Sequence, residues 1–300
     1  MPFSAHMYAE ADLPHLLAFL AEVHADGWQR GYFHPGDLIW GLYQNIIYDP
    51  TQNIRLWHDE TGNLAGWAWF ERAMVEVQVH PRLRGQGVLE GLMLDWAEEM
   101  ARQRRLEDPP RAWVRVPDSS TALLALLAQR GFERDPFHYR TLYRDLHEPI
   151  PDSPLPEGCT VRHVMGDDEF APRVNLHRIV WYPSKVTLPA YRRLRAAPIY
   201  EPELDLVAVL SDGDFGAYCI CWYDPASRAG EFEPVGTHPD RRGQGLGKGV
   251  VLEGLRRLKA RGALAAIVYS VGSGDAANRL YETVGFREVD RVYLHYKVLG

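Results

Sequence analysis

The chain has 300 residues, of which 46% are hydrophobic and 24% charged, with three cysteines and a formal net charge of −7. These values are typical of a globular protein of about two domains; they exclude a disulfide-stapled scaffold and disfavour a general nucleic-acid binder. No apolar run approaches the ~20 residues of a membrane span and the N-terminus lacks a signal-peptide pattern, so we expect a cytoplasmic protein with no membrane or nucleic-acid partner.

An internal repeat runs through the sequence. Residues 77–87 align without a gap with residues 235–245, and the pair Gly131-Phe132 recurs as Gly285-Phe286. Self-similarity at a constant offset indicates duplication of one structural unit, here of about 150 residues. The two copies are predicted to be two domains of the same kind that pack on each other.

A proline-rich stretch separates the two copies. Residues 149–156 contain four prolines, which prevent a regular helix or central strand and favour a stiff, extended linker. The predicted division is therefore an N-terminal domain at 1–146, a linker at 147–158 and a C-terminal domain at 159–300.

Each copy shows the same order of elements: helices, a hairpin, a strand, a glycine-rich loop and a long amphipathic helix. Early helices are predicted at 11–23, 170–180 and 188–195, and hairpins at 54–70 and 206–223. The long helices carry apolar residues at helical spacing, namely Leu92, Trp96 and Met100 in one copy and Val251, Leu255 and Leu258 in the other. A strand at 265–270, a helix at 276–284 and a strand at 292–297 complete the second copy. The pattern predicts α/β units with mixed sheets.

The glycine-rich loop of the second copy, Arg242–Lys248, has three glycines and flanking cations where a strand gives way to a helix. Glycines let a backbone approach an anion closely, and the free N–H groups of a first helical turn attract negative charge, so the loop is a candidate phosphate cradle. Its spacing fits neither a Walker loop nor the G-x-G-x-x-G dinucleotide pattern. Glycines near a helix start can also be plain turn residues.

Two motifs together resemble the GNAT acetyltransferase superfamily. Arg242, Gly245 and Gly247 fit its R-x-x-G-x-G signature, and residues 280–286 fit its L-Y-x-x-x-G-F motif. The resemblance covers nearly the whole chain as two tandem units, in the arrangement of the mycothiol synthase group. It implies an α/β (α+β) fold of two tandem GNAT domains, each a mixed, mostly antiparallel sheet flanked by helices. It also implies acetyl-CoA as cosubstrate.

The resemblance assigns the cofactor contacts to the strand and loop of the second copy. Backbone groups of the strand would hold the pantetheine arm and polarise the thioester, and the loop with its cations would hold the pyrophosphate. These expected cofactor-binding residues are Val235, Gly236, Thr237, Arg241, Arg242, Gly243, Gln244, Gly245, Leu246, Gly247 and Lys248. The arginines could instead be solvated surface charges.

The resemblance also assigns the catalytic residues. Tyr281 stands where many members place the acid that protonates the departing thiolate, and Glu231 or Glu233 is the expected general base, with Glu231 preferred. A neutral tyrosine can donate a proton to a thiolate as it forms. The alternatives are a tyrosine buried against the sheet and glutamates exposed on a strand.

The first copy departs from the pattern. Leu89 replaces the second required glycine, which is expected to bring a bulky side chain close to the pyrophosphate, and Leu127 stands at the position of Tyr281. We therefore predict that the first copy is catalytically silent, although residues 85–87 could still hold coenzyme A weakly. Acceptor recognition is expected from residues 181–184 and from 27–30 with Tyr32 and Phe33, unless these aromatics belong to the core.

The expected function is transfer of an acetyl group from acetyl-CoA to the amine of a small molecule by direct attack in a ternary complex. The alternative is a non-catalytic protein that binds CoA or acyl-CoA for regulation or structure. The 12 histidines show no metal-ligand spacing, so no metal is expected. The sequence leaves the acceptor, the acyl chain length and the oligomeric state open.

Overall fold

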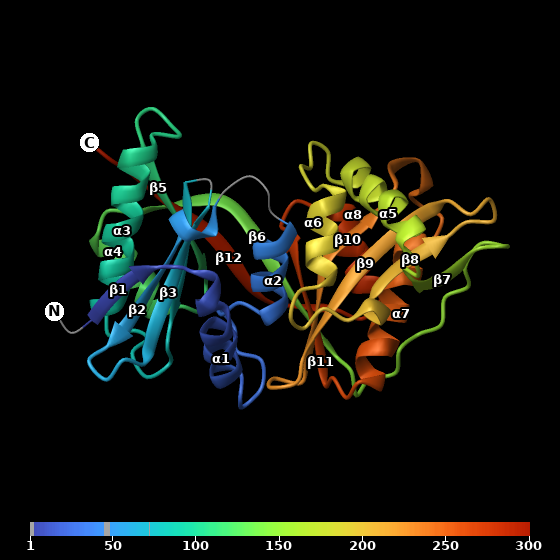
Figure 1. Cartoon of the computed structure of the whole chain (residues 1–300), viewed down its shortest axis with the longest axis horizontal. Coiled ribbons are helices and arrows are strands. Elements are labelled where there is room, and N and C mark those ends of the chain that lie inside the picture. Colours follow the sequence, from blue (N-terminus) through green and yellow to red (C-terminus); the bar gives the residue numbers. More distant parts are fainter. Residues whose placement is uncertain (1–2, 45–48, 72) are drawn as a thin grey trace.

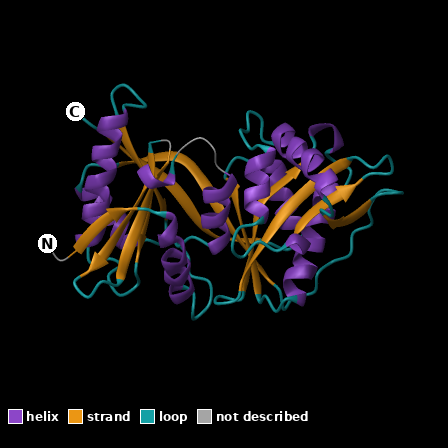
Figure 2. Ribbon diagram, in the orientation of Figure 1, coloured by secondary structure: helices purple, strands orange, loops and turns teal. Residues whose placement is uncertain are grey.

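The strands of the described residues form one twelve-stranded sheet that extends through both halves (Figure 1; Figure 2). The computed structural model describes residues 3–44, 49–71 and 73–300. In spatial order the strands run β1-β2-β3-β4-β5-β12-β6-β11-β10-β9-β8-β7. The strands are β1 (Phe3–Met7), β2 (Ile54–Asp59), β3 (Leu64–Glu71), β4 (Met74–Val79), β5 (Arg111–Pro117), β6 (Glu133–Asp145), β7 (Thr160–His163), β8 (Asp205–Val209), β9 (Phe215–Asp224), β10 (Ala229–Thr237), β11 (Ala265–Val271) and β12 (Arg287–Val298).

Helices cover both faces of this sheet (Figure 2). They are α1 (Leu13–Val23), α2 (Pro35–Gln44), α3 (Val88–Arg104), α4 (Thr121–Gln129), α5 (Asp167–Val180), α6 (Leu188–Arg195), α7 (Leu246–Ala260) and α8 (Asp275–Thr283). Short 3-10 turns lie at Glu10–Asp12, Pro50–Gln52, Pro202–Leu204 and Pro239–Arg241. Because both faces are covered, β3 and β9 read as nearly continuous apolar runs rather than alternating ones.

The apolar residues form three cores. One core joins the halves, because α1 and α2 pack with α5 and α6 over the same face of the sheet. On the other face, α3 and α4 cover the N-terminal strands, and α7 and α8 cover the C-terminal strands, as two separate cores. The halves are thus fused on one face and independent on the other.

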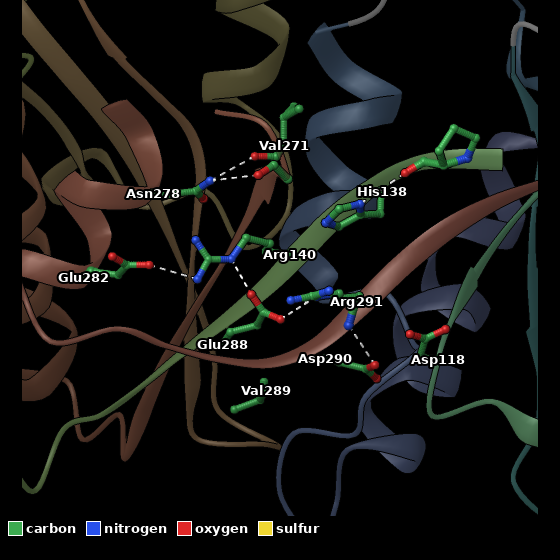
Figure 3. A network of polar contacts seen from close by, with 12 residues as sticks. Asp118, His138, Arg140, Val271, Asn278, Glu282, Glu288, Val289, Asp290 and Arg291 are labelled. Carbon is green, nitrogen blue, oxygen red and sulfur yellow. Dashed lines mark hydrogen bonds and ion pairs between the residues drawn. The ribbon is translucent and has the colours of Figure 1, made fainter. Parts of the chain in front are cut away.

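The two halves exchange their last strands. β12, the last strand of the chain, lies between β5 and β6, and β6 in turn pairs with β11. Arg140 on β6 links the halves at this crossing: its Nη2 donates to Glu282 Oε1 on α8 at 2.9 Å, and it also bonds Glu288 on β12 (Figure 3). Glu288 accepts in addition from Arg291 Nε at 2.6 Å. Each half therefore completes its sheet with a strand of the other.

The fold class expected from the sequence is confirmed. Within the described residues, parallel pairing is limited to β4–β5 and β10–β11, so the sheet is mixed and mostly antiparallel. The helix expected at 188–195 is α6, whose N-cap Thr187 accepts from Ala190 N–H at 3.3 Å. The strand exchange was not expected, and neither was α2. No described helix combines the length and apolarity that a membrane crossing requires.

Candidate active site

The β10–β11 pair opens into a cleft. Its parallel hydrogen bonding covers only Ala229 to Glu231 on β10, opposite Ala265 to Ile267 on β11. Just after Glu231 the register of β10 against β9 shifts, between Phe232 and Val235. A bulge of this kind bends a strand away from its neighbour, so the edge of β10 from Val235 onward faces open space.

The β4–β5 pair of the N-terminal half opens in the same way, since its parallel pairing covers only Met74 and Val75 on β4. Both openings lead into one cavity of about 820 Å³. Val235 and Tyr281 line it from the C-terminal half, and Gln78 and Arg84 line it from the N-terminal half. The exchanged strands β6 and β12 contribute to its wall as well. The repeat therefore builds one shared cavity from its two copies.

The C-terminal glycine loop has an open cradle. Gly243 and Gly245 take φ values of +78° and +82°, which glycine adopts without strain, and a β-carbon at either position would meet nothing within 4 Å. Within the described residues, neither N–H group donates to a protein acceptor. Gly245 is the N-cap of α7, so the cradle lies at the positive end of a helix of 15 residues.

The cations expected at this loop flank its glycines in the sequence. Arg242 is exposed and Lys248 is half-buried, and neither forms an ion pair with a described residue. Arg241 lies 3.9 Å from Asp212. Free N–H groups, unpaired cations and open space suit a diphosphate, so the loop residues fit the CoA pyrophosphate.

Gly247 has a different role from Gly243 and Gly245. It packs against β10, where an added β-carbon would lie 2.5 Å from Thr237 Oγ1. Leu89, its counterpart in the first copy, is 1% exposed and belongs to the core under α3. The expectation that Leu89 obstructs the pyrophosphate is wrong, because its side chain is buried in this core.

The N-terminal glycine loop has the same backbone shape but is filled. Gly85 and Gly87 take φ values of +81° and +80°. Glu90, in the first turn of α3, accepts from Gly85 N–H at 2.6 Å and from Gly87 N–H at 3.1 Å. Arg84 turns away from the loop: its Nη2 donates to Ser120 Oγ at 2.8 Å, and its guanidinium lies over the Tyr32 ring.

Tyr281 lies on α8 at the edge of the cavity. Its ring packs edge-on against Phe286, with centroids 5.7 Å apart, so it is buried and lines the cavity as well. Burial, and after it the charge of Glu233, raise the pKa of Tyr281 well above its usual value. The hydroxyl is therefore protonated at any physiological pH.

Carboxyl groups from both halves face the same part of the cavity. Glu233 lines it from β10, Asp37 from α2 and Glu76 from β4. Glu76 pairs with Arg115 of β5, with Oε1 and Nη1 2.7 Å apart. Burial and the Asp37 carboxylate raise the pKa of Glu233 to about 8, against the opposite effect of Arg115. Burial and Asp37 likewise raise the pKa of Glu76 to about 7, again opposed by Arg115.

Glu231 lies beneath this cluster and not among the residues that line the cavity. It is 0% exposed, and its Oε2 lies 3.2 Å from Nδ1 of His34, which belongs to the N-terminal half. His34 Nδ1 also accepts a hydrogen bond from Gly36 N–H at 3.0 Å, so this nitrogen carries no proton. Burial, followed by the charge of Glu233, raises the pKa of Glu231 to about 8. Glu233 is therefore better placed than Glu231 to reach a substrate.

The residues expected to recognise the acceptor separate into two groups. Trp181, Arg30, Tyr32 and Phe33 line the cavity. Tyr182 is 87% exposed and points into solvent.

Sequence reasoning missed Asp37, Glu76 and Arg115, because a single charged residue in an element of the first copy gives no signal of its own. Glu90 did leave a signal, since it stands where the second copy has Lys248. Within the described residues, no group of three or more His, Cys, Asp or Glu residues could hold a metal ion.

Known proteins match this chain over most of its length. A family model described as the acetyltransferase (GNAT) family matches residues 173–286. A mycothiol acetyltransferase of Thermomonospora curvata is 33% identical over 78% of this chain and 80% of its own length. A mycothiol acetyltransferase of Streptomyces coelicolor is 32% identical over 77% of this chain and 76% of its own length.

Solved structures share the fold. A tandem GNAT protein from the clavulanic acid biosynthesis pathway has a TM-score of 0.68 and 16% identity, and the match covers 99% of each chain. A GCN5-related N-acetyltransferase from Sphaerobacter thermophilus has a TM-score of 0.66 and 23% identity, and the match covers 99% of this chain and 95% of that one. The chain belongs to the GNAT family. It is an acetyltransferase built from two tandem GNAT units.

Proposed function

We propose that the protein transfers the acetyl group of acetyl-CoA to the amine of a small cationic acceptor, in a ternary complex at the shared cavity. One observation carries this proposal. The same cavity is lined by Tyr281, by the open edge of β10 and by carboxyl groups from both halves. An acid, a thioester-binding edge and a site for an ammonium group are thus held together.

The C-terminal half would bind the cosubstrate. The pyrophosphate would accept hydrogen bonds from the free N–H groups of the loop, and Arg242 and Lys248 would balance its charge. The pantetheine arm would follow the edge of β10 that β11 leaves unpaired, past Val235, Gly236 and Thr237. Backbone N–H groups on such an edge can stabilise the oxyanion that forms as the thioester is attacked.

The carboxyl cluster would receive the amine. Burial raises the pKa values of Glu233 and Glu76, and burial followed by the charge of Glu231 raises that of Asp37. An ammonium ion favours ionised carboxyl groups beside it, so its binding offsets these shifts. Glu233 would then take the proton that makes the amine nucleophilic. Asp37 and Glu76 would hold the ammonium group before this transfer.

The chemical step balances with these groups alone. The amine nitrogen attacks the thioester carbonyl carbon, the new C–N bond forms and the C–S bond breaks. Glu233 takes one proton from the ammonium group before the attack. The nitrogen loses a second proton as the amide forms, and this proton replaces the one that the Tyr281 hydroxyl gives to the departing thiolate. Positioning of the two substrates supplies most of the acceleration in a reaction of this type.

The test is thiol release from acetyl-CoA across a panel of amines, which includes the amine that mycothiol acetyltransferases acetylate. We expect turnover with at least one cationic amine and initial-rate patterns of a sequential mechanism. Tyr281→Phe should lower kcat by roughly 10²–10⁴-fold and leave CoA binding unchanged. Tyr296→Phe, at a surface tyrosine that donates to Glu133, is the matched control. Saturable CoA binding without turnover on any amine would contradict the proposal.

A further inference from the structure

We propose that Glu90 fills the anion cradle of the N-terminal half and thereby keeps coenzyme A out of it, so that the chain binds one CoA and not two. The inference concerns the half that the proposed function does not use. It rests on the geometry of two loops that the repeat makes directly comparable.

The two loops have the same backbone. Gly85 and Gly243 differ by 3° in φ, and Gly87 and Gly245 differ by 2°. Both loops end at a glycine N-cap of a long helix, α3 or α7. The first copy has therefore kept the shape that presents two N–H groups to an anion.

The difference lies in what meets those N–H groups. In the first copy the two carboxylate oxygens of Glu90 accept from Gly85 and Gly87, one oxygen each. Glu90 is 3% exposed, and within the described residues it pairs with no cation. Its negative charge is balanced by the N–H groups and by the positive end of α3, as a bound phosphate would be.

The matching position of the second copy carries the opposite charge. Counting along the aligned repeat, Glu90 corresponds to Lys248. One copy thus carries a glutamate at this position, with its carboxylate on the cradle, and the other carries a lysine. A phosphate entering the N-terminal loop would have to displace Glu90 and then lie beside a second negative charge.

A second change in the first copy acts in the same direction. Arg84 matches Arg242, but its guanidinium is held by Ser120 and lies 4.4 Å from the Tyr32 ring centroid. It therefore does not face the cradle as a free cation. The carboxylate of Glu90 and the orientation of Arg84 both disfavour the binding of a diphosphate to the N-terminal loop.

The test is calorimetric titration of the full chain with coenzyme A. Wild type should bind one equivalent, and Gly245→Val, which disables the C-terminal loop, should bind none. Adding Glu90→Ala to Gly245→Val should restore binding of one equivalent. Glu99→Ala, which removes an exposed carboxylate on the same helix, should restore none.

Glu90→Gln in the wild-type background is the second variant, in case the double variant does not fold. It should raise the stoichiometry from one to two, because the amide retains no charge to repel the diphosphate. Two equivalents on wild type, or no binding gained by either folded Glu90 variant, would overturn the proposal. If wild type binds no CoA but Glu90→Ala binds one equivalent, this inference stands and the proposed function fails.

Discussion

The N-terminal and C-terminal glycine loops share one backbone shape but differ in what fills them. The first loop holds the carboxylate of Glu90 on its N–H groups, whereas the second leaves those groups free beside Lys248. In this duplicated fold the same loop backbone holds a side-chain carboxylate on its N–H groups in one copy and leaves those groups without a protein acceptor in the other. The backbone shape of such a loop is no proof that it binds a phosphate.

The same comparison applies to the two clefts. Both copies open their parallel strand pair, but the first has Leu127, buried in its core, at the position where the second has Tyr281 beside the cavity. The first copy contributes instead Asp37, Glu76 and Arg115 to the shared cavity. The silent first copy stays a prediction: this half has a leucine at the position of Tyr281, and it lines the cavity in which we place the acceptor.

The largest expected effect comes from valine substitutions in the two loops. Gly245→Val should weaken CoA binding by at least about a hundredfold, since it strains the loop and disturbs two hydrogen bonds worth roughly 1.5–3 kcal/mol each to a charged group. Gly87→Val makes the same change at the same φ in the first copy and should leave kcat/KM nearly unchanged. Titration with CoA and steady-state kinetics check both variants, with thermal unfolding as the control for folding. Equal loss of activity in the two variants would contradict the proposal that only the C-terminal loop binds CoA.

Asp37→Asn tests whether the first copy serves the acceptor. It should raise the KM for the amine by about tenfold, the effect of roughly 1.4 kcal/mol, with little change in the Kd for CoA. Asn can still accept the hydrogen bond that His34 N–H donates to Asp37, so α2 should remain folded. Asp26→Asn, at an exposed position of the same half, is the matched control. An unchanged KM would show that the N-terminal carboxyl groups do not hold the amine.

The pH dependence of kcat/KM tests whether Glu233 of the second copy acts as the general base. A base must be deprotonated to act, and the pKa of Glu233 is raised to about 8 by burial and Asp37. The rate should therefore increase as the pH rises from 6 and level off above about 8. Because Glu231 and Glu233 interact, the apparent pKa belongs to the pair. Glu233→Gln should lower the rate and flatten the profile, whereas a flat profile in wild type would exclude this base.

The smallest effect concerns stability. The folded-state pKa of Glu231, about 8, lies above the ordinary value of about 4.5, so the folded state holds a proton that unfolding releases. Stability should therefore fall as the pH rises through this window. The Tm of wild type should decrease between pH 6 and pH 9, and in Glu231→Gln this decrease should be smaller by a few degrees. Glu253→Gln, on the outer side of α7, should show the wild-type dependence.

The sequence allowed much of the fold to be predicted, because its signals are local. Helical spacing, proline punctuation and the repeat indicated the order of elements, and the bounds of α6 agree with the predicted 188–195. The exchange of β6 and β12 could not be predicted from local patterns, because β12 pairs with β5 and β6 through residues more than 140 positions apart along the chain. That Asp37 and Glu76 lie near Glu233 was missed for the same reason. Their proximity results from the exchange and from the placement of α2 between the halves (Figure 1).

The central claim is that one loop of the two binds the cosubstrate. A crystal structure of the chain soaked with acetyl-CoA tests it most directly. We expect one molecule, with its pyrophosphate on residues 243–248 and its thioester near Val235 and Tyr281, and Glu90 still bonded to Gly85 and Gly87. A second acetyl-CoA on residues 85–87, or one bound there alone, would contradict it.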